Sequence, residues 1–502
     1  KDLWDNSKYD IDHIYPQSKV MDDSLDNRVL VKKTYNAEKT DNYPINADIR
    51  QDMKGFWKTL LDGGFISKEK YIRLTRSNEF EPSELAGFIQ RQLVETRQST
   101  KAVASILKQL LPDTEIVYVK AKTVSQFRQD FDLIKVREMN DLHHAKDAYL
   151  NIVVGNVYYT KFTKDAAWFV QNNPGRSYNL RKMFAGGKDI VDTKRNETAW
   201  KMGDNGTIVT VKRIMSINNI LVSRRSYEVK GGLFDQQLMK KGKGQVAVKG
   251  SDDRLSSVEK YGGYNKAAGS YFMLVESEDK KQRKIRTIEY VPLYMVDRFE
   301  KNFRELESFL VDIQGLRNPR VILSKIRIDT LFNVDGFYMW LSGRTGNQLI
   351  FKGANQLLLD INHMRTLKKV IKYVQRQKEN KNIKLFEQDN LTSKELLDLY
   401  DEFLDKISNT IYSVRLSTQE KFLKNNREKF ELLSAENKCL VLYEILHLFQ
   451  CQSMTADLGI MGGPKKAGIL CLNNNITKYN KVSIVNQSPT GIYQKEIDLK
   501  RI

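Results

Sequence analysis

The sequence predicts a multidomain α+β protein, and three observations support that prediction. The chain has 502 residues, enough for about two to four domains with separate hydrophobic cores. Apolar residues recur at helical spacing in its first half, whereas short apolar strands separated by glycine-rich turns fill much of its second half. Hydrophobic residues make up 41% of the sequence and charged residues 29%, as is ordinary for a globular protein.

The charge balance is less ordinary. Lys and Arg total 82 against 62 for Asp and Glu, which gives a formal net charge of +20. Such a surplus favours a polyanionic partner, most simply nucleic acid, although a basic protein with scattered charge is the alternative. The three cysteines (Cys439, Cys451 and Cys471) form no CxxC pair, which argues against a zinc cluster or a disulfide framework and fits a reducing cytosol. No run of about 18 apolar residues occurs, so we expect no membrane span.

The first 160 residues predict a hairpin followed by helices. DIDHIYP is a short strand that ends at Pro16, RVLVKK is a second strand after the turn-rich MDDSLDN, and TYNAEKTDN begins a helix. A long amphipathic helix is expected from Pro82, with its apolar pattern continuing to Leu111. EIVYVKA is typical of a buried strand and NDLHHAKDAYLNIVVGNVYYTKF of a helix, an order that suits an α/β layer.

Beyond about residue 205 the pattern changes to short strands and turns. TIVTVKRI and SYFMLVES are expected strands, and GRTGN is expected to join FYMWLS and QLIFKGANQLLL in a hairpin. Ser393 is expected to cap a helix that buries Leu396, Tyr400 and Phe403. CLNNNITKY and KVSIVNQ return to strands, so this region is predicted to be strand-rich α+β with a helical insert.

Four polar residues near the start of the chain form a pattern with chemical meaning. Asp12 and His13 lie on the first expected strand, Asn27 in the turn, and Asn36 in the following helix. Hydrolysis of a phosphodiester requires a general base and a cation that stabilises charge on the phosphate. Histidine is the natural base near neutral pH, and a carboxylate with an amide oxygen can hold Mg²⁺.

The residues alone leave two points open. Strict strand alternation sends Asp12 and His13 to opposite faces, so both serve one site only if the strand ends or bulges there, which Pro16 nearby allows. An isolated Asp-His pair is a weak signal, and Asn27 within DDSLDN is typical of a simple turn residue.

The ordered pattern DIDHIYPQS, DDSLDNRVLV and a following asparagine resembles the second half of an HNH ββα-metal nuclease finger. The resemblance implies that His13 is the general base and that Asp12 and Asn36 are ligands of Mg²⁺, with Mn²⁺ as the alternative ion. It gives Asn27 a structural or phosphate-side role.

A second pair lies in NDLHHAKDAYLN. His144 and Asp147 are three residues apart and share one face of the expected helix. A helical carboxylate beside a histidine suits a two-metal phosphodiesterase, and a surface His-Asp pair near a helix start is the alternative.

Three segments decide between these interpretations by resemblance. GFIQRQLVETRQSTK, KAKTVSQFRQDF and VREMNDLHHAKDAYLNIVVGN, in this order after the HNH pattern, resemble the type II CRISPR-associated RNA-guided DNA endonucleases. They are similar to that family's inter-nuclease linker and third RuvC segment. The resemblance implies that Asp147 is a catalytic, metal-binding carboxylate and that His144 is the base of a second active site. Lys146 stands where some relatives have a third histidine.

The resemblance implies four regions in the chain. These are the C-terminal part of an HNH nuclease domain at 1–80, a linker helix at 81–97, a partial RNase-H-like α/β RuvC segment at 98–228, and a strand-rich domain at 229–502 that reads the motif flanking the target, the PAM. The family's other RuvC carboxylates, arginine-rich bridge helix and helical lobe have no counterpart in this sequence. We therefore expect a C-terminal portion of such an enzyme, with an incomplete RuvC site.

Two glycine-rich segments of the last region resemble nucleic-acid contacts of the family. EVKGGLFDQQL is similar to the loop that grips the target-strand phosphate, which implies contacts from Gln236 or Gln237. EKYGGYN is similar to a motif through which Lys260 and Tyr264 would contact RNA. A simple glycine-rich turn is the alternative for both.

The flanking motif is predicted to contain adenine. Arginine is the side chain that pairs with guanine in the major groove, and no arginine lies between Arg427 and Arg501. Asparagine and glutamine suit the edge of adenine instead. Three consecutive asparagines are also typical of a turn. The candidate readers are Asn473, Asn474, Asn475, Lys478 and Gln487.

The partners follow from the same resemblance. It implies a monomeric antiviral defence enzyme of the bacterial cytoplasm that binds a guide RNA, made of crRNA and tracrRNA, and cuts double-stranded DNA together with its missing N-terminal part. Two other classes remain open: a free-standing HNH endonuclease with a basic DNA-binding tail, and a non-catalytic nucleic-acid-binding module in which Asp12, His13 and Asn36 are structural.

Overall fold

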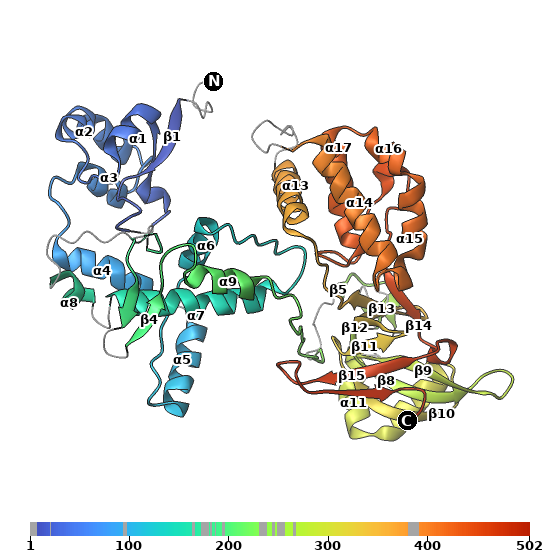
Figure 1. The fold of residues 1–502 in the computed structure, drawn as a ribbon. Coiled ribbons are helices and arrows are strands. Elements are labelled where there is room, and N and C mark those ends of the chain that lie inside the picture. Colours follow the sequence, from blue (N-terminus) through green and yellow to red (C-terminus); the bar gives the residue numbers. More distant parts are fainter. Residues whose placement is uncertain are drawn as a thin grey trace. The chain divides into compact units, whose positions relative to one another are not determined.

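A computed structural model gives the fold of the chain as two compact units (Figure 1). Unit 1 comprises Lys1–Ile134 and His144–Ile217, and unit 2 comprises Lys135–His143 and Asn218–Ile502. Among the residues that the structure describes, no helix is both long and apolar enough to cross a membrane. The described residues are 8–20, 22–93, 98–162, 166–171, 180, 183–185, 187–192, 196–229, 238–242, 246–247, 257–264, 268–379 and 391–502.

Unit 1 begins with the predicted hairpin and helix. Strands β1 (Tyr9–His13) and β2 (Arg28–Lys32) pair antiparallel, and α1 (Lys33–Lys39) follows directly. The structure thus confirms both strands and the helix of this segment. A small core lies beneath them, in which Ile14 packs with Trp57 of α2 (Ala47–Asp62). Helix α3 (Lys68–Thr75) completes this core.

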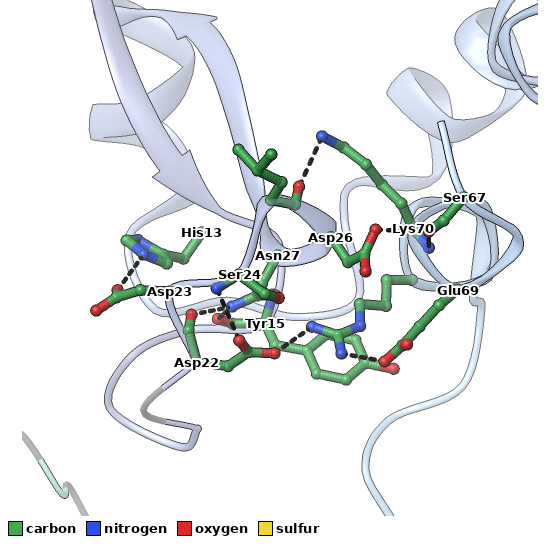
Figure 2. A network of polar contacts seen from close by, with 12 residues as sticks. His13, Tyr15, Asp22, Asp23, Ser24, Asp26, Asn27, Ser67, Glu69 and Lys70 are labelled. Atoms are coloured by element: carbon green, nitrogen blue, oxygen red, sulfur yellow. Dashed lines mark hydrogen bonds and ion pairs between the residues drawn. The ribbon is translucent and has the colours of Figure 1, made fainter. Parts of the chain in front are cut away.

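The loop between β1 and β2 is held by one buried side chain, as Figure 2 shows. Asn27 is fully buried, and its Oδ1 accepts a hydrogen bond from the Tyr15 backbone N–H at 2.8 Å. Its Nδ2 donates to the backbone carbonyls of Tyr15 and Asp22, at 3.1 and 3.0 Å. These three hydrogen bonds all go to main-chain groups, which favours the structural role that the resemblance offered as one choice for Asn27.

The larger core of unit 1 surrounds α7 (His143–Phe162). Leu150, Val154 and Val157 of this helix are fully buried and pack in one cluster with Phe127 and Trp200. The remaining elements of the unit are α4 (Pro82–Leu93), α5 (Gln98–Leu110), α6 (Ala121–Asp130), α7 (His143–Phe162), α8 (Ala166–Gln171), β3 (Ile190–Asp192), β4 (Glu197–Trp200) and α9 (Thr207–Met215). Helices α4 and α5 confirm helical structure in the region after Pro82.

Two predicted strands of this unit are wrong. EIVYVKA forms no strand; it packs on α7, where a Cβ added at Gly155 would come within 2.7 Å of Val119 Cγ2. TIVTVKRI forms helix α9 instead. Its apolar residues Ile208, Val211 and Met215 lie three and four positions apart and pack on the core, so helical burial outweighs the strand preference of its β-branched residues.

Unit 2 contains the strand-rich region. Its larger sheets are antiparallel, one with the strand order β10-β8-β9 and one with the order β14-β13-β12-β11-β15-β16. The structure confirms SYFMLVES within β8, the hairpin at GRTGN between β12 and β13, and KVSIVNQ as β15. The strands are β5 (Leu238–Met239), β6 (Val246–Ala247), β7 (Gly263–Tyr264), β8 (Gly269–Glu278), β9 (Lys284–Pro292), β10 (Arg317–Ile326), β11 (Leu331–Val334), β12 (Phe337–Thr345), β13 (Gln348–Gly353), β14 (Leu470–Asn473), β15 (Val482–Gln487) and β16 (Gln494–Asp498).

The helical insert is larger than predicted and packs into its own bundle, drawn in orange in Figure 1. Thr392, not Ser393, caps α14 (Ser393–Asn409), because its side chain and that of Glu395 each bond the other's backbone N–H. Short helices α10 (Val258–Tyr261), α11 (Val296–Lys301) and α12 (Phe303–Ser308) lie outside this insert. The insert contains α13 (Ile361–Glu379), α14 (Ser393–Asn409), α15 (Ser413–Asn425), α16 (Arg427–Glu431) and α17 (Ala435–Leu448).

A buried polar network joins the turn after β14 to β9. Asn474 is 9% exposed, and its Nδ2 donates to Glu289 Oε1 at 2.9 Å. The other oxygen of Glu289 accepts from Arg344 at 2.7 Å, and the Ile288 N–H donates to the Asn474 carbonyl at 2.9 Å. A carboxylate that is only 2% exposed depends on such partners, because an unpaired buried charge is strongly unfavourable.

Replacement of Asn27 by Ala should destabilise the hairpin by about 3 kcal/mol, since three main-chain groups lose their buried partner. Hydrogen exchange of the β1 and β2 amides measures the loss and should be faster in the variant. Asn42→Ala, which changes an exposed side chain, is the control and should leave the exchange unchanged. Equal exchange in both variants would contradict the structural role of Asn27.

Replacement of Asn474 by Ala should lower the free energy of unfolding of unit 2 by about 1–3 kcal/mol, because Glu289 loses a donor. Calorimetry of the chain should show a lower transition temperature for this variant. Asn480→Ala, at an exposed position of the same turn region, is the matched control. If both variants unfold at the wild-type temperature, the network does not stabilise the turn.

Candidate active site

The first candidate site lies between β1 and α1. Strand alternation points Asp10 and Asp12 to the face that α1 covers. Asn36 Nδ2 donates to Asp10 Oδ2 at 3.1 Å, and Lys39, one turn further along α1, places its Nζ 2.8 Å from Asp12 Oδ2. The same ammonium donates to the His13 carbonyl at 2.6 Å. Asp12 and Asn36 thus lie on the side of β1 that meets α1, where Asn36 contacts Asp10 and Lys39 contacts Asp12.

The imidazole of His13 lies with the loop between the two strands, as Figure 2 shows. Its Nε2 is 2.9 Å from Asp23 Oδ1, and Gln17 Nε2 donates to the same oxygen at 2.7 Å. The other oxygen of Asp23 is 2.6 Å from Lys122 Nζ. Burial alone would raise the pKa of Asp23, but the bonds from Lys122, His13 and Gln17 outweigh it and lower this pKa to about 2.

The donor chemistry of the first site fits a hard divalent cation. Asp10, Asp12 and Asn36 offer carboxylate and amide oxygens, the ligands that Mg²⁺ prefers. In the described arrangement, the Lys39 ammonium is the cation paired with Asp12. Sequence reasoning missed Asp10 and Lys39. The two-residue period of the strand could have identified Asp10, because it places Asp10 and Asp12 on one face.

The second candidate site lies on α7. Asp147 Oδ1 accepts hydrogen bonds from Arg128 Nε at 2.9 Å and from Arg128 Nη2 at 2.6 Å. The guanidinium comes from α6, and its side chain is only 8% exposed. His144 lies one helical turn before Asp147, on the face that the sequence predicted. Burial, and next the charge of Arg128, lower the pKa of Lys146. Sequence reasoning missed Arg128, since no local period links α6 to α7.

The asparagines after β14 form a turn. Asn473 Oδ1 accepts the Asn475 N–H at 3.0 Å, and Asn475 Oδ1 accepts the Thr477 N–H at 3.1 Å. The amide of Asn474 is committed to the buried Glu289, which disfavours a contact between that side chain and a base. Lys478 is exposed, and Gln487 ends β15 opposite Gln494. Base reading by Asn473, Asn475, Lys478 and Gln487 stays a prediction.

The predicted RNA contacts differ in exposure. Lys260 is exposed, and its Nζ lies 5.2 Å from the centroid of the Tyr261 ring. Tyr264 lies on β7 between β5 and β6 and is 9% exposed, which leaves little of its ring for stacking. Gln236 and Gln237 lie outside the described residues.

One further group of metal-ligand type occurs among the described residues. Ligand atoms of Asp360, His363 and Glu402 lie within 4.8 Å of one another in unit 2. Asp360 accepts the His363 N–H at 3.1 Å and pairs with its ring, and Glu402 pairs with Lys406 at 3.1 Å. Each carboxylate of this group thus has a protein partner, and the group belongs to neither candidate site.

Three family profiles match successive parts of the chain. The profile of HNH endonuclease matches residues 1–45, which contain Asp12, His13 and Asn36. The profile of the Cas9 RuvC domain matches residues 97–226, which contain α7. The profile of the PAM-interacting domain of CRISPR-associated endonuclease Cas9 matches residues 230–495.

Similar proteins from three bacteria are each described as a CRISPR-associated endonuclease Cas9. The chain is 30% identical to the CRISPR-associated endonuclease Cas9 of Streptococcus mutans serotype c over 535 aligned positions, which cover 99% of the chain and 38% of that protein. It is 32% identical to the CRISPR-associated endonuclease Cas9 of Listeria innocua serovar 6a over 400 positions, which cover 73% of the chain and 28% of that protein. The Staphylococcus aureus protein of that name is 30% identical over 164 positions, 30% of the chain and 16% of that protein.

The chain therefore spans less than two fifths of the length of these relatives. The PAM-interacting profile alone covers more than half of the chain, and the three profiles follow one another along it. From these matches, the chain belongs to the CRISPR-associated endonuclease Cas9 family.

Proposed function

We propose that the chain is the C-terminal part of an RNA-guided DNA endonuclease. In this proposal the HNH segment, a ββα-metal finger within residues 1–80, cuts the DNA strand paired with the guide. The observation that carries the proposal is that Asp12 and Asn36 lie where β1 meets α1, with His13 at the end of β1, inside the stretch matched by the HNH endonuclease profile. The linker helix at 81–97 joins it to the RuvC segment.

The residues of the first site have distinct roles in hydrolysis. Asp12 and Asn36, with Asp10 beside them, would hold Mg²⁺, which when bound stabilises negative charge on the phosphate and the leaving oxygen. His13 removes a proton from the attacking water. Asn27 keeps the loop and the strand end in place, so that His13 has a fixed orientation.

The RuvC segment, at 98–228, contributes Asp147 and His144 to a second, RNase-H-like site that cuts the displaced strand. Asp147 serves as a metal-binding carboxylate and His144 as the base. Both bonds from the Arg128 guanidinium go to Oδ1 of Asp147, so a metal ion would bind through Oδ2 or displace the guanidinium. Completion of the site requires carboxylates from other segments. The chain covers only 38% of the Streptococcus mutans relative, and the rest of that protein's length is enough to contain such segments.

The domain at 229–502 reads the flanking motif, and base pairing with the guide supplies the remaining specificity. A formal charge of +20 supports contact with the phosphates of guide RNA and target DNA. Lys260 and the region of Gln236 and Gln237 would contribute to these contacts. We place the enzyme in the bacterial cytoplasm, where guide RNA and invading DNA meet.

Two substitutions test the division of labour between the sites. In the full-length protein loaded with guide RNA and Mg²⁺, His13→Ala should slow cleavage of the guide-paired strand by at least about 100-fold, because a general base is lost. Asp147→Ala should spare that strand and block cleavage of the displaced one. Nicking of a plasmid with differently labelled strands separates the two activities.

Asp62→Ala, which breaks only an exposed ion pair with Lys58, is the control and should leave both rates unchanged. The role assignments are wrong if His13→Ala and Asp147→Ala block the same strand. Cleavage by the 502-residue chain alone, without guide RNA, would instead indicate a free-standing HNH endonuclease.

A library of randomised flanking sequences tests the predicted motif. Targets whose flanking motif contains adenine should be depleted first, because amide side chains pair with adenine N6 and N7. Gln487→Ala should weaken this preference, whereas Ser488→Ala should not. Strong selection for two guanines without any preference for adenine would refute the predicted motif.

A further inference from the structure

A carboxylate outside the predicted donor set touches the candidate general base. Asp23 Oδ1 lies 2.9 Å from His13 Nε2, although the two residues are ten positions apart and Asp23 belongs to the loop. Resemblance and sequence pattern gave this residue no role. Its two oxygens have different partners, with Oδ1 directed to His13 and Gln17 and Oδ2 directed to Lys122.

The contact fixes which ring nitrogen of His13 carries the proton. An ionised carboxylate only accepts hydrogen bonds, so the close Nε2 must be the donor. Gln17 Nε2 lies 3.0 Å from the same ring nitrogen and donates one hydrogen bond to Asp23 Oδ1. A bare Nε2 of His13 next to the carboxylate would be repulsive, so this nitrogen carries its own hydrogen. The lone pair is therefore on Nδ1, which leaves that nitrogen to accept a proton.

The orientation of Asp23 is itself fixed. Lys122 of α6 holds Oδ2 at 2.6 Å, and the Gln17 amide holds Oδ1 at 2.7 Å. Arg28 adds a weaker contact, with its Nη2 3.5 Å from Oδ1. A carboxylate with both oxygens occupied in this way keeps a single rotamer and so presents a fixed acceptor to the imidazole.

We propose that Asp23 is a positioning residue for the general base, which holds His13 in the Nε2–H tautomer and directs Nδ1 toward the attacking water. The inference rests on the proposed function of His13 and adds a residue to it. A bond between a carboxylate and the far nitrogen of a catalytic imidazole is a general device for this purpose, since loss of the carboxylate leaves the ring free to adopt the wrong tautomer.

Asp23→Asn gives a sharp prediction because of Lys122. The carboxamide has one acceptor oxygen, and the ammonium of Lys122 needs it, so the NH₂ group turns to His13. Such a donor selects the Nδ1–H tautomer, which cannot act as the base at Nδ1. In the double variant Asp23→Asn with Lys122→Met, the oxygen is released and can turn back to Nε2–H.

Nuclear magnetic resonance of ¹⁵N-labelled histidine reports the tautomer without any need for activity. The chain has only five histidines, so His13→Asn identifies the His13 signals by their loss. Wild-type protein should show a protonated Nε2, and Asp23→Asn should show a protonated Nδ1. A protonated Nδ1 in the wild type overturns the proposal.

Cleavage by the guided full-length protein supplies the second readout. Asp23→Asn should slow single-turnover cleavage of the guide-paired strand by about 10- to 100-fold, with unchanged affinity for the target and unchanged cleavage of the displaced strand. The double variant should recover part of the rate. Asp26→Asn is the matched control, because this carboxylate of the same loop accepts from Ser67 at 2.6 Å and does not contact His13.

The two failures are distinguishable. If wild-type protein does not cut the guide-paired strand, the proposed function fails whatever the tautomer. If wild-type protein cuts and Asp23→Asn cuts that strand at the wild-type rate, the proposed function survives and the positioning role of Asp23 is wrong. Equal slowing by Asp26→Asn would show a general effect of the loop and would also overturn that role.

Discussion

In β1, successive side chains point to opposite faces, and the candidate active site depends on how the chain uses that alternation. Asp10 and Asp12 face α1, where Asn36 and Lys39 contact them. His13, at the last position of the strand, contacts the loop instead. The strand thus separates the oxygen donors from the imidazole, and the buried amide of Asn27 fixes the loop that carries the partner of that imidazole.

Short-range patterns predicted the parts of the fold that depend on neighbouring residues. The hairpin β1–β2 with α1, and the hairpin β12–β13, follow from apolar alternation and turn residues within one segment. Resemblance predicted Asp12, His13 and Asn36 as one group, and in the structure Asp12 and Asn36 lie where β1 meets α1. Strict alternation sends Asp12 and His13 to opposite faces, and in the structure Asp12 contacts α1 while His13 contacts the loop.

Contacts between distant segments were not predictable in this way. Asp23 meets Lys122, and Arg128 meets Asp147, only because α6 packs beside the loop and beside α7. The β-branched residues of the α9 segment favour a strand, but its apolar residues pack on the core at helical spacing, and the segment forms a helix. Asn474 fits both a reader and a turn from sequence, and its buried bond to Glu289 favours the turn.

The location of a bound divalent ion tests the proposed nuclease site most directly. Addition of Mn²⁺ to the ¹⁵N-labelled chain broadens the amide signals nearest to the ion. Signals of Asp10, Asp12 and Asn36 should broaden first, and Asp12→Ala should abolish this effect. Broadening confined to the insert around His363, with no change in β1 or α1, would contradict the metal-dependent nuclease site proposed for the hairpin.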